Sequence, residues 1–141
     1  MATIDGVAIA ADQEVVDLSG RSLTVFPPEL LTLTNIKVLD LSNNDITSIP
    51  AGITAMVNLV ELNMANNKLI TIPAAMADMG AQLENLDVSG NSTITSLDAS
   101  LMNVLHTNLN NPRIYLIHTG ITVTNLPAGM SGSVYCCRFA T

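Results

Sequence analysis

The sequence has 141 residues, of which 48% are hydrophobic and 12% charged, so it contains enough apolar side chains for one core of ordinary domain size. Its formal net charge is −7, from 12 acidic and 5 basic residues. Nucleic acid and anionic membrane surfaces are excluded as expected partners, because the clustered Lys and Arg that neutralise phosphate groups are missing.

The first 12 residues form a short lead-in in which apolar residues alternate with polar ones. Its apolar residues are Ile4, Val7 and Ile9. Without a positively charged start, and with Asp5 and Asp12 interrupting it, this segment makes a poor signal peptide. No window of the chain has 18 uninterrupted apolar residues, so membrane insertion is not expected. We interpret residues 1–12 as an N-terminal cap, with a loose terminus as the alternative.

A pattern of about 23 residues recurs along the rest of the chain. Residues 36–50 and the segment that starts at Leu59 carry apolar side chains, an asparagine and a proline at the same offsets. A fixed period of this size is typical of a repeat array. The spacing divides the chain into repeats at 13–35, 36–58, 59–82 and 83–110, a degraded repeat at 111–129 and a C-terminal cap at 130–141.

The repeated pattern resembles the leucine-rich repeat of the kind LxxLxLxxNxLxxIPxxIxxL. The resemblance implies an α/β fold, a right-handed solenoid in a horseshoe arc, with a parallel β-sheet on the concave face and short helical or 3-10 turns on the convex face. One short strand cannot bury its apolar face alone, but stacked copies bury a continuous core. Pro27, Pro50 and Pro73 are predicted at the first helical position, where no backbone donor is lost.

An asparagine recurs where the chain leaves each predicted strand. Asn44, Asn67 and Asn91 occupy this position, and Arg21 replaces asparagine in the first repeat. The resemblance, together with the need to satisfy buried backbone groups, predicts a ladder of asparagine side chains bonded to neighbouring turns. Residues 91–93 also match the N-glycosylation sequon, but we interpret the match as incidental because a ladder asparagine points inward.

The outward residues of the predicted strands are the candidate binding residues. The predicted partner-binding set on the concave face is Val15, Asp17, Val38, Asp40, Ser42, Glu61, Asn63, Asp87, Tyr115 and His118. Because strands lie about 4.8 Å apart, equivalent side chains are expected to stand in rows. We predict an acidic, amide-rich face for a basic or polar segment of another protein or peptide. The alternative is a solvated strand face, because Asp and Asn are common at this position in the family.

No catalytic or metal-binding motif emerges from the polar residues. Neighbouring carboxylates can perform acid–base chemistry or bind calcium, but Asn63 separates Asp40 from Asp87. His106 and His118 lie 12 residues apart, without a zinc-ligand spacing. No nucleophile elbow, phosphate loop or dinucleotide fingerprint is present. Enzymatic activity, a cofactor and a metal are therefore not expected.

The only two cysteines, Cys136 and Cys137, are adjacent and provide no disulfide framework. We expect them to pack in the C-terminal cap, with a redox or palmitoylation role as the alternative. The missing disulfides and signal favour a cytoplasmic location, and an extracellular one is the alternative if the chain is a truncated piece.

The predicted function is that of a protein–protein interaction module that binds its partner through the concave face. The alternative is a ligand-sensing repeat segment, or a truncated relative of a larger receptor-like or kinase-linked protein. The chain is expected to be a monomer, or a weak dimer through the apolar residues of its C-terminal end, Val134, Tyr135 and Phe139.

Overall fold

The computed structural model describes residues 1–79, 82–98, 101, 113–117, 119–121 and 134–135. Its strands are β1 (Ala2–Ile4), β2 (Val7–Ile9), β3 (Val15–Asp17), β4 (Val38–Asp40), β5 (Glu61–Asn63), β6 (Asn85–Asp87), β7 (Arg113–Tyr115) and β8 (Val134–Tyr135). Its 3-10 helices are η1 (Pro28–Thr32), η2 (Ala51–Ala55) and η3 (Ala74–Met79). The predictions for His106, His118, Cys136 and Cys137 lie outside the described residues, as do parts of the predicted segments 83–110, 111–129 and 130–141.

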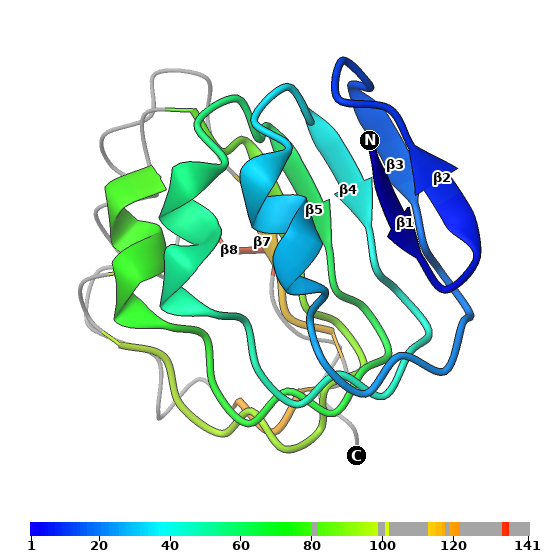
Figure 1. Ribbon diagram of the computed structural model, residues 1–141. Helices are drawn as coiled ribbons and strands as arrows, with labels where there is room; N and C mark the ends of the chain where they lie inside the picture. Colours follow the sequence, from blue (N-terminus) through cyan, green and yellow to red (C-terminus); the bar gives the residue numbers. More distant parts are fainter. Residues whose placement is uncertain (80–81, 99–100, 102–112, 118, 122–133, 136–141) are drawn as a thin grey trace.

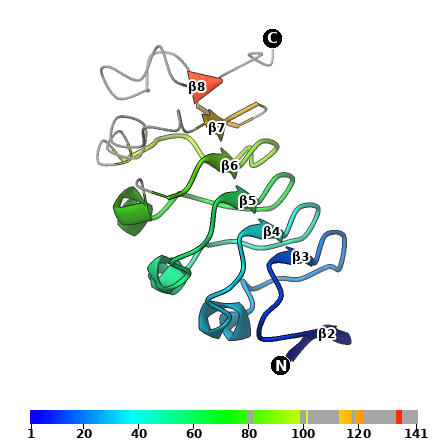
Figure 2. The same cartoon turned by 90° about the horizontal axis from the view of Figure 1, so that it is seen from above.

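The strands from β3 to β8 form one parallel sheet whose spatial order is the order of the chain. Each turn of the coil therefore adds one strand beside the previous one. The strands stack along one side of the coil and the 3-10 helices along the other (Figure 1, Figure 2). This arrangement confirms the predicted α/β repeat solenoid with a parallel sheet and short 3-10 turns.

The register of the sheet aligns equivalent residues of successive repeats. One row, which we call the acidic row, consists of Asp17, Asp40, Asn63, Asp87 and Tyr115. The second row, which we call the mixed row, consists of Val15, Val38, Glu61, Asn85 and Arg113. These are the rows that the sequence spacing predicts. The longer interval before β7 leaves the register intact, because the additional residues lie between strands.

The core lies between the sheet and the 3-10 helices. The inward strand residues Leu39, Leu62 and Leu86 are at most 2% exposed, and Ile53 and Met56 approach them from the helical side with no exposed surface. The buried residues form one continuous cluster that extends from Ile4 at the end of β1 to Ile121. Stacking therefore gives each short strand the apolar neighbours that its own repeat lacks.

The prolines lie one residue earlier than predicted. Pro27 and Pro50 precede η1 and η2, and their ψ angles of 114° and 146° are extended rather than helical. A proline ring restricts φ to about −65°, a value that suits both a helix and an extended segment. The prediction was wrong because φ alone does not determine on which side of the boundary the residue lies.

The N-terminal hairpin of β1 and β2 is antiparallel and separate from the main sheet. Its turn contains Asp5 and Gly6, both with positive φ, as two-residue hairpins favour. Ile4 and Ile9 are buried in the same core as the repeats. Asp5 also forms an ion pair of 3.5 Å with Arg21 of the first repeat.

Candidate functional site

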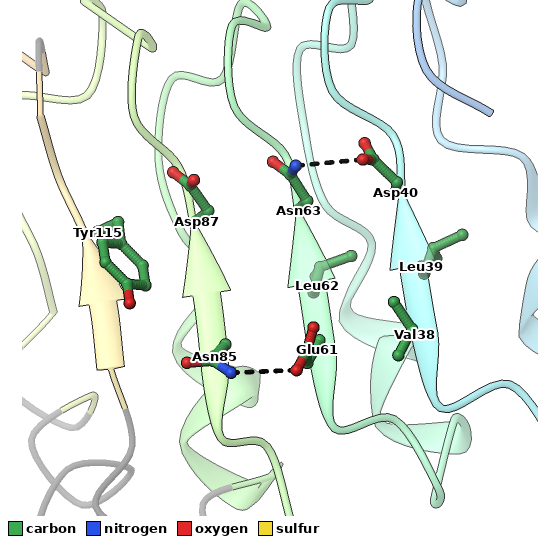
Figure 3. A pocket seen from close by; sticks show the side chains of 9 residues that line it. All are labelled: Val38, Leu39, Asp40, Glu61, Leu62, Asn63, Asn85, Asp87 and Tyr115. Atoms are coloured by element: carbon green, nitrogen blue, oxygen red, sulfur yellow. Dashed lines mark hydrogen bonds between the residues drawn. The ribbon is translucent and has the colours of Figure 1, made fainter. Parts of the chain in front are cut away.

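A hollow of about 370 Å³ lies on the outward face of the sheet, across β4 to β7. It is lined by Val38, Leu39, Asp40, Glu61, Leu62, Asn63, Asn85, Asp87 and Tyr115 (Figure 3). The two leucines are at most 1% exposed, so they contribute little of the accessible surface. The hollow therefore presents the middle of the acidic and mixed rows.

The Asp and Asn side chains of the acidic row are held by the backbone that follows them. In each case one side-chain oxygen accepts a hydrogen bond from the N–H two residues on, at 2.8–3.0 Å. The pairs are Asp17 with Ser19, Asp40 with Ser42, Asn63 with Ala65 and Asp87 with Ser89. This is the turn that Asp and Asn side chains form with nearby backbone. It explains in structural terms why this position prefers Asp or Asn.

Two further hydrogen bonds connect neighbouring strands across the hollow. The Asn63 amide donates to the second oxygen of Asp40 at 3.3 Å, and the Asn85 amide donates to Glu61 at 3.3 Å (Figure 3). The polar side chains are thus positioned by the protein itself before any ligand arrives. Three lining residues, Asp40, Glu61 and Asp87, are carboxylates, and no lining residue is basic.

The structure brings six of the ten predicted binding residues together in this hollow: Val38, Asp40, Glu61, Asn63, Asp87 and Tyr115. Val15 and Asp17 are exposed on β3, outside the hollow. Asn85 lines it, although the predicted set omits it. The sequence could have identified Asn85, because it occupies the same position in the fourth repeat as Val38 and Glu61 in the second and third.

Ser42 is a correction to the predicted set, because it is only 6% exposed. Its N–H donates to Asp40, and its carbonyl accepts from the N–H of Gly20 at 3.0 Å and from the Asn44 amide at 3.1 Å. The chain turns inward at this residue toward the asparagine ladder. Ser42 therefore belongs to the framework and offers a partner very little surface.

Hydrogen bonds from Ser19 lower the pKa of Asp17. The hydroxyl of Ser19 donates to it at 2.7 Å and the Ser19 N–H at 2.9 Å. These bonds, helped by the positive charge of Arg21, stabilise the carboxylate and lower the pKa of Asp17 below its ordinary 3.8. Asp17 is therefore ionised under all ordinary conditions.

The predicted ladder residues lie buried at the end of the strands. The side-chain oxygen of Asn44 accepts from the N–H groups of Arg21 and Leu23, at 2.9 and 3.0 Å. Its amide donates to the carbonyls of Leu18 and Leu41, both at 2.9 Å. Asn67 and Asn91 repeat this arrangement one and two repeats later, and each accepts one backbone N–H and donates to carbonyls of its own and the preceding turn. Each ladder asparagine thus bonds its own turn to the preceding one.

The sequon asparagine is the most buried of the ladder residues. Asn91 is 0% exposed, and both polar atoms of its side chain are bonded to backbone. A glycan cannot be attached there in the folded chain. Among the described side chains, no buried nitrogen or oxygen lacks a hydrogen-bond partner.

The described part of the chain contains neither a cluster of metal ligands nor a membrane-spanning helix. No group of three or more His, Cys, Asp or Glu side chains is placed to hold a metal ion there. The helices within those same residues are too short or too polar to cross a bilayer.

The comparisons with known proteins agree with the repeat architecture. Residues 34–78 match the family model described as Leucine Rich repeats (2 copies). A comparison with curated protein sequences finds no match.

Two solved structures share the fold of this chain. A leucine-rich repeat protein of Leptospira interrogans superposes with a TM-score of 0.61 at 21% identity, covering 82% of this chain and 34% of that one. A plant ice-binding protein superposes with a TM-score of 0.56 at 24% identity, covering 69% of this chain and 30% of that one. This chain therefore spans about a third of the length of either structure. The repeat pattern, the family match over residues 34–78 and the stacked parallel strands together show that the chain has the leucine-rich repeat fold and is similar to leucine-rich repeat proteins.

Proposed function

We propose that this chain binds a partner protein or peptide through the hollow on its strand face. Leucine-rich repeat folds generally mediate protein–protein interaction, and the chain has that fold. The observation that carries the proposal is the hollow itself. It combines three carboxylates, two amides and the partly exposed side chains of Val38 and Tyr115 on a single sheet.

The side chains of the hollow are held in fixed positions, which favours binding. Asp40 and Asp87 are each bonded to backbone, and Asn63 and Asn85 bridge neighbouring strands. A surface that is already ordered loses little conformational entropy on association, so more of the contact energy appears as affinity.

The charge of the hollow favours a basic partner. Asp40, Glu61 and Asp87 lie on three adjacent strands within a chain of net charge −7. Complementary charge accelerates encounter and rejects acidic competitors. Binding is therefore expected to weaken as salt increases.

Charge-neutral variants test this proposal without removing framework bonds. Asp40→Asn, Glu61→Gln and Asp87→Asn together remove three charges and leave one oxygen in each side chain. That oxygen can still accept the backbone N–H at Asp40 and Asp87 and the Asn85 amide at Glu61, and only the bond from Asn63 to the second oxygen of Asp40 is lost. The matched control is Asp12→Asn, Glu29→Gln and Asp78→Asn, at exposed positions outside the hollow. We expect partners captured with the wild-type chain to be lost with the first triple variant and retained with the control. Equal capture by both would refute binding at the hollow.

A second candidate, ice binding, is favoured by a different surface. Beyond the ladder, equivalent positions hold the row Thr24, Thr47, Ile70 and Thr95 and the adjacent row Val25, Ser48, Thr71 and Ser96. All eight residues are exposed. The N–H of Ile70 donates to the Thr47 carbonyl at 3.4 Å, which holds successive turns together there. Regular rows of hydroxyl and methyl groups on a rigid surface can align a matching layer of water molecules.

Ice recrystallisation measured in the presence of the purified chain tests this candidate. We expect inhibition by the wild-type chain and its loss with Thr47→Lys, which places a bulky charge in the middle of the row. Thr34→Lys is the control, because Thr34 is exposed on another part of the coil. Crystals that grow at the same rate with and without the wild-type chain would exclude ice binding.

A further inference from the structure

The geometry points to a specific ligand pattern for the hollow: an extended segment with a basic residue between two apolar residues, at positions i, i+2 and i+4. This inference rests on the proposed function, because it concerns the same hollow. It goes further by stating which side chains the partner presents and at what spacing.

The two apolar anchors lie at opposite ends of the hollow. Val38 is on β4 and Tyr115 is on β7, and both are partly exposed. The ring of Tyr115 lines the hollow and leans along its strand toward the level of Asn85 (Figure 3). Each end therefore offers an accessible contact for one apolar side chain of a ligand.

The carboxylates lie between these anchors. Glu61 is on β5 and Asp87 is on β6, the two strands that separate β4 from β7. Asn63 and Asn85 are on the same two strands and supply neutral donors and acceptors. A cation at the middle of the hollow therefore meets negative charge from both central strands.

The spacing of the sheet sets the spacing of the ligand. Three strand intervals of about 4.8 Å separate β4 from β7, or about 14 Å across the sheet. Tyr115 starts two residues further along its strand than the row of Val38, and its ring leans back toward that row (Figure 3). An extended segment advances about 3.4 Å per residue, so four residues cover nearly the same distance. Alternate side chains of such a segment point the same way, so i, i+2 and i+4 face the sheet together. A basic residue at i+2 then lies above β5 and β6.

Two synthetic heptapeptides of identical composition test the pattern. The probe is Ser-Leu-Ser-Lys-Ser-Leu-Ser, and the control, Ser-Leu-Lys-Ser-Ser-Leu-Ser, moves the lysine to i+1, where it points away from the sheet. In fluorescence anisotropy, we expect the probe to bind the wild-type chain roughly tenfold more tightly than the control, about one charge-pair difference in affinity. Equal affinities would overturn the pattern.

Substitutions at the anchors provide an independent measurement. Tyr115→Ala and Val38→Ser are each expected to weaken binding of the probe several-fold. The matched control is Val57→Ser, because Val57 is 56% exposed and lies outside the hollow. Probe binding that is insensitive to both anchor variants would also overturn the pattern.

Selection from a random peptide library on phage separates the failure of this inference from failure of the proposed function. Peptides are selected on the immobilised wild-type chain. Each selected peptide is then tested for binding to the triple variant Asp40→Asn, Glu61→Gln and Asp87→Asn. Peptides with the i, i+2, i+4 pattern that need the wild-type hollow support the inference. Hollow-dependent peptides without the pattern overturn the inference and leave the proposed function standing. Peptides that bind the wild-type chain and the triple variant equally count against both.

Discussion

Asp40 uses its two carboxylate oxygens for different purposes. One accepts the Ser42 N–H at 2.8 Å and stabilises the turn at the strand end. The other accepts from Asn63 at 3.3 Å on the floor of the hollow. The framework bond and the surface charge therefore come from the same side chain. For this reason Asp→Asn is a more informative substitution than Asp→Ala, because it removes charge and keeps the turn.

Replacement of a ladder asparagine is expected to destabilise the fold strongly. Asn67→Ala leaves the N–H of Ile46 and the carbonyls of Leu41 and Met64 without their side-chain partner. The free energy of unfolding should fall by on the order of 3 kcal/mol, because more than one buried group loses its bond. Urea denaturation followed by circular dichroism measures the change. The control Asn58→Ala, which removes one exposed bond to Thr34, should cost less than about 1 kcal/mol.

The pKa of Asp17 depends on the serine beside it. Removing the hydroxyl in Ser19→Ala is expected to raise the pKa of Asp17 toward 3.8, because the largest stabilising contact of the carboxylate is lost. In the wild-type chain the pKa is lower in the folded state. The contribution to stability is therefore present above the ordinary pKa and lost as pH falls through the folded value. Carboxyl chemical shifts measured by NMR between pH 2 and 6 test this, and an identical titration in the variant would contradict it.

The turns that follow β3, β4, β5 and β6 each require a left-handed residue. Gly20, Asn43, Asn66 and Gly90 occupy equivalent positions, with φ between 54° and 76°. Glycine and asparagine tolerate this conformation better than other residues. Asn66 also donates to Asn43 at 3.1 Å, which connects two exposed turns. These turns therefore favour Gly or Asn because of the backbone conformation. A binding role is not needed to explain the asparagines at these positions.

Alanine at the two glycines separates conformational strain from crowding. Gly20→Ala should cost about 1 kcal/mol from strain alone, because a Cβ there meets no atom within 4 Å. Gly90→Ala should cost more, because its Cβ would lie 2.1 Å from the side-chain oxygen of Asn66. Combining it with Asn66→Gly, which removes the two nearest atoms and leaves only the backbone nitrogen of residue 66 at 3.2 Å, should lower the cost of Gly90→Ala toward that at Gly20. A thermal denaturation cycle of these variants measures the coupling, and additive effects would exclude the crowding explanation.

At the scale of the molecule, one core connects the hairpin to the later repeats. Ile4 and Ile9 belong to the same buried cluster as Leu86 and Ile121. In a linear stack each layer is stabilised mainly by its neighbours. The loss of a buried side chain in the terminal layer therefore also destabilises the repeats that pack against it. The same stacking brings β4 to β7 side by side and creates the hollow, which no single repeat contains.

Truncation of a hairpin side chain is expected to destabilise the whole described array. Ile9→Ala removes a fully buried side chain and should lower the free energy of unfolding by about 3 kcal/mol. Because the core is continuous, urea unfolding should remain a single transition with a lower midpoint. Val7→Ala, at a less buried position of the same strand, should cost less. A separate early transition in Ile9→Ala would show that the hairpin unfolds independently of the repeats.

The sequence alone determined the repeat, its strands and their register. A period of 23 residues with fixed apolar positions can satisfy its strands only by stacking, so the rows from Asp17 to Tyr115 followed from counting. The ladder positions Asn44, Asn67 and Asn91 followed from the family resemblance together with the need of the backbone leaving each strand for hydrogen-bond partners.

Only the tertiary structure decided which outward residues are surface and which are framework. Ser42 alternates outward by periodicity, yet the turn toward Asn44 buries it. The φ angle of Pro27 and Pro50 suits both a helix and an extended segment, and in the folded chain both residues are extended. The hollow combines side chains from four repeats. Val38 and Tyr115, at its two ends, are 77 positions apart in the sequence. The sequence pattern of a repeat shows which side chains that repeat contributes. The solvent exposure and the hydrogen bonds of those side chains depend on the neighbouring turns of the stack, so they could not be predicted from one repeat.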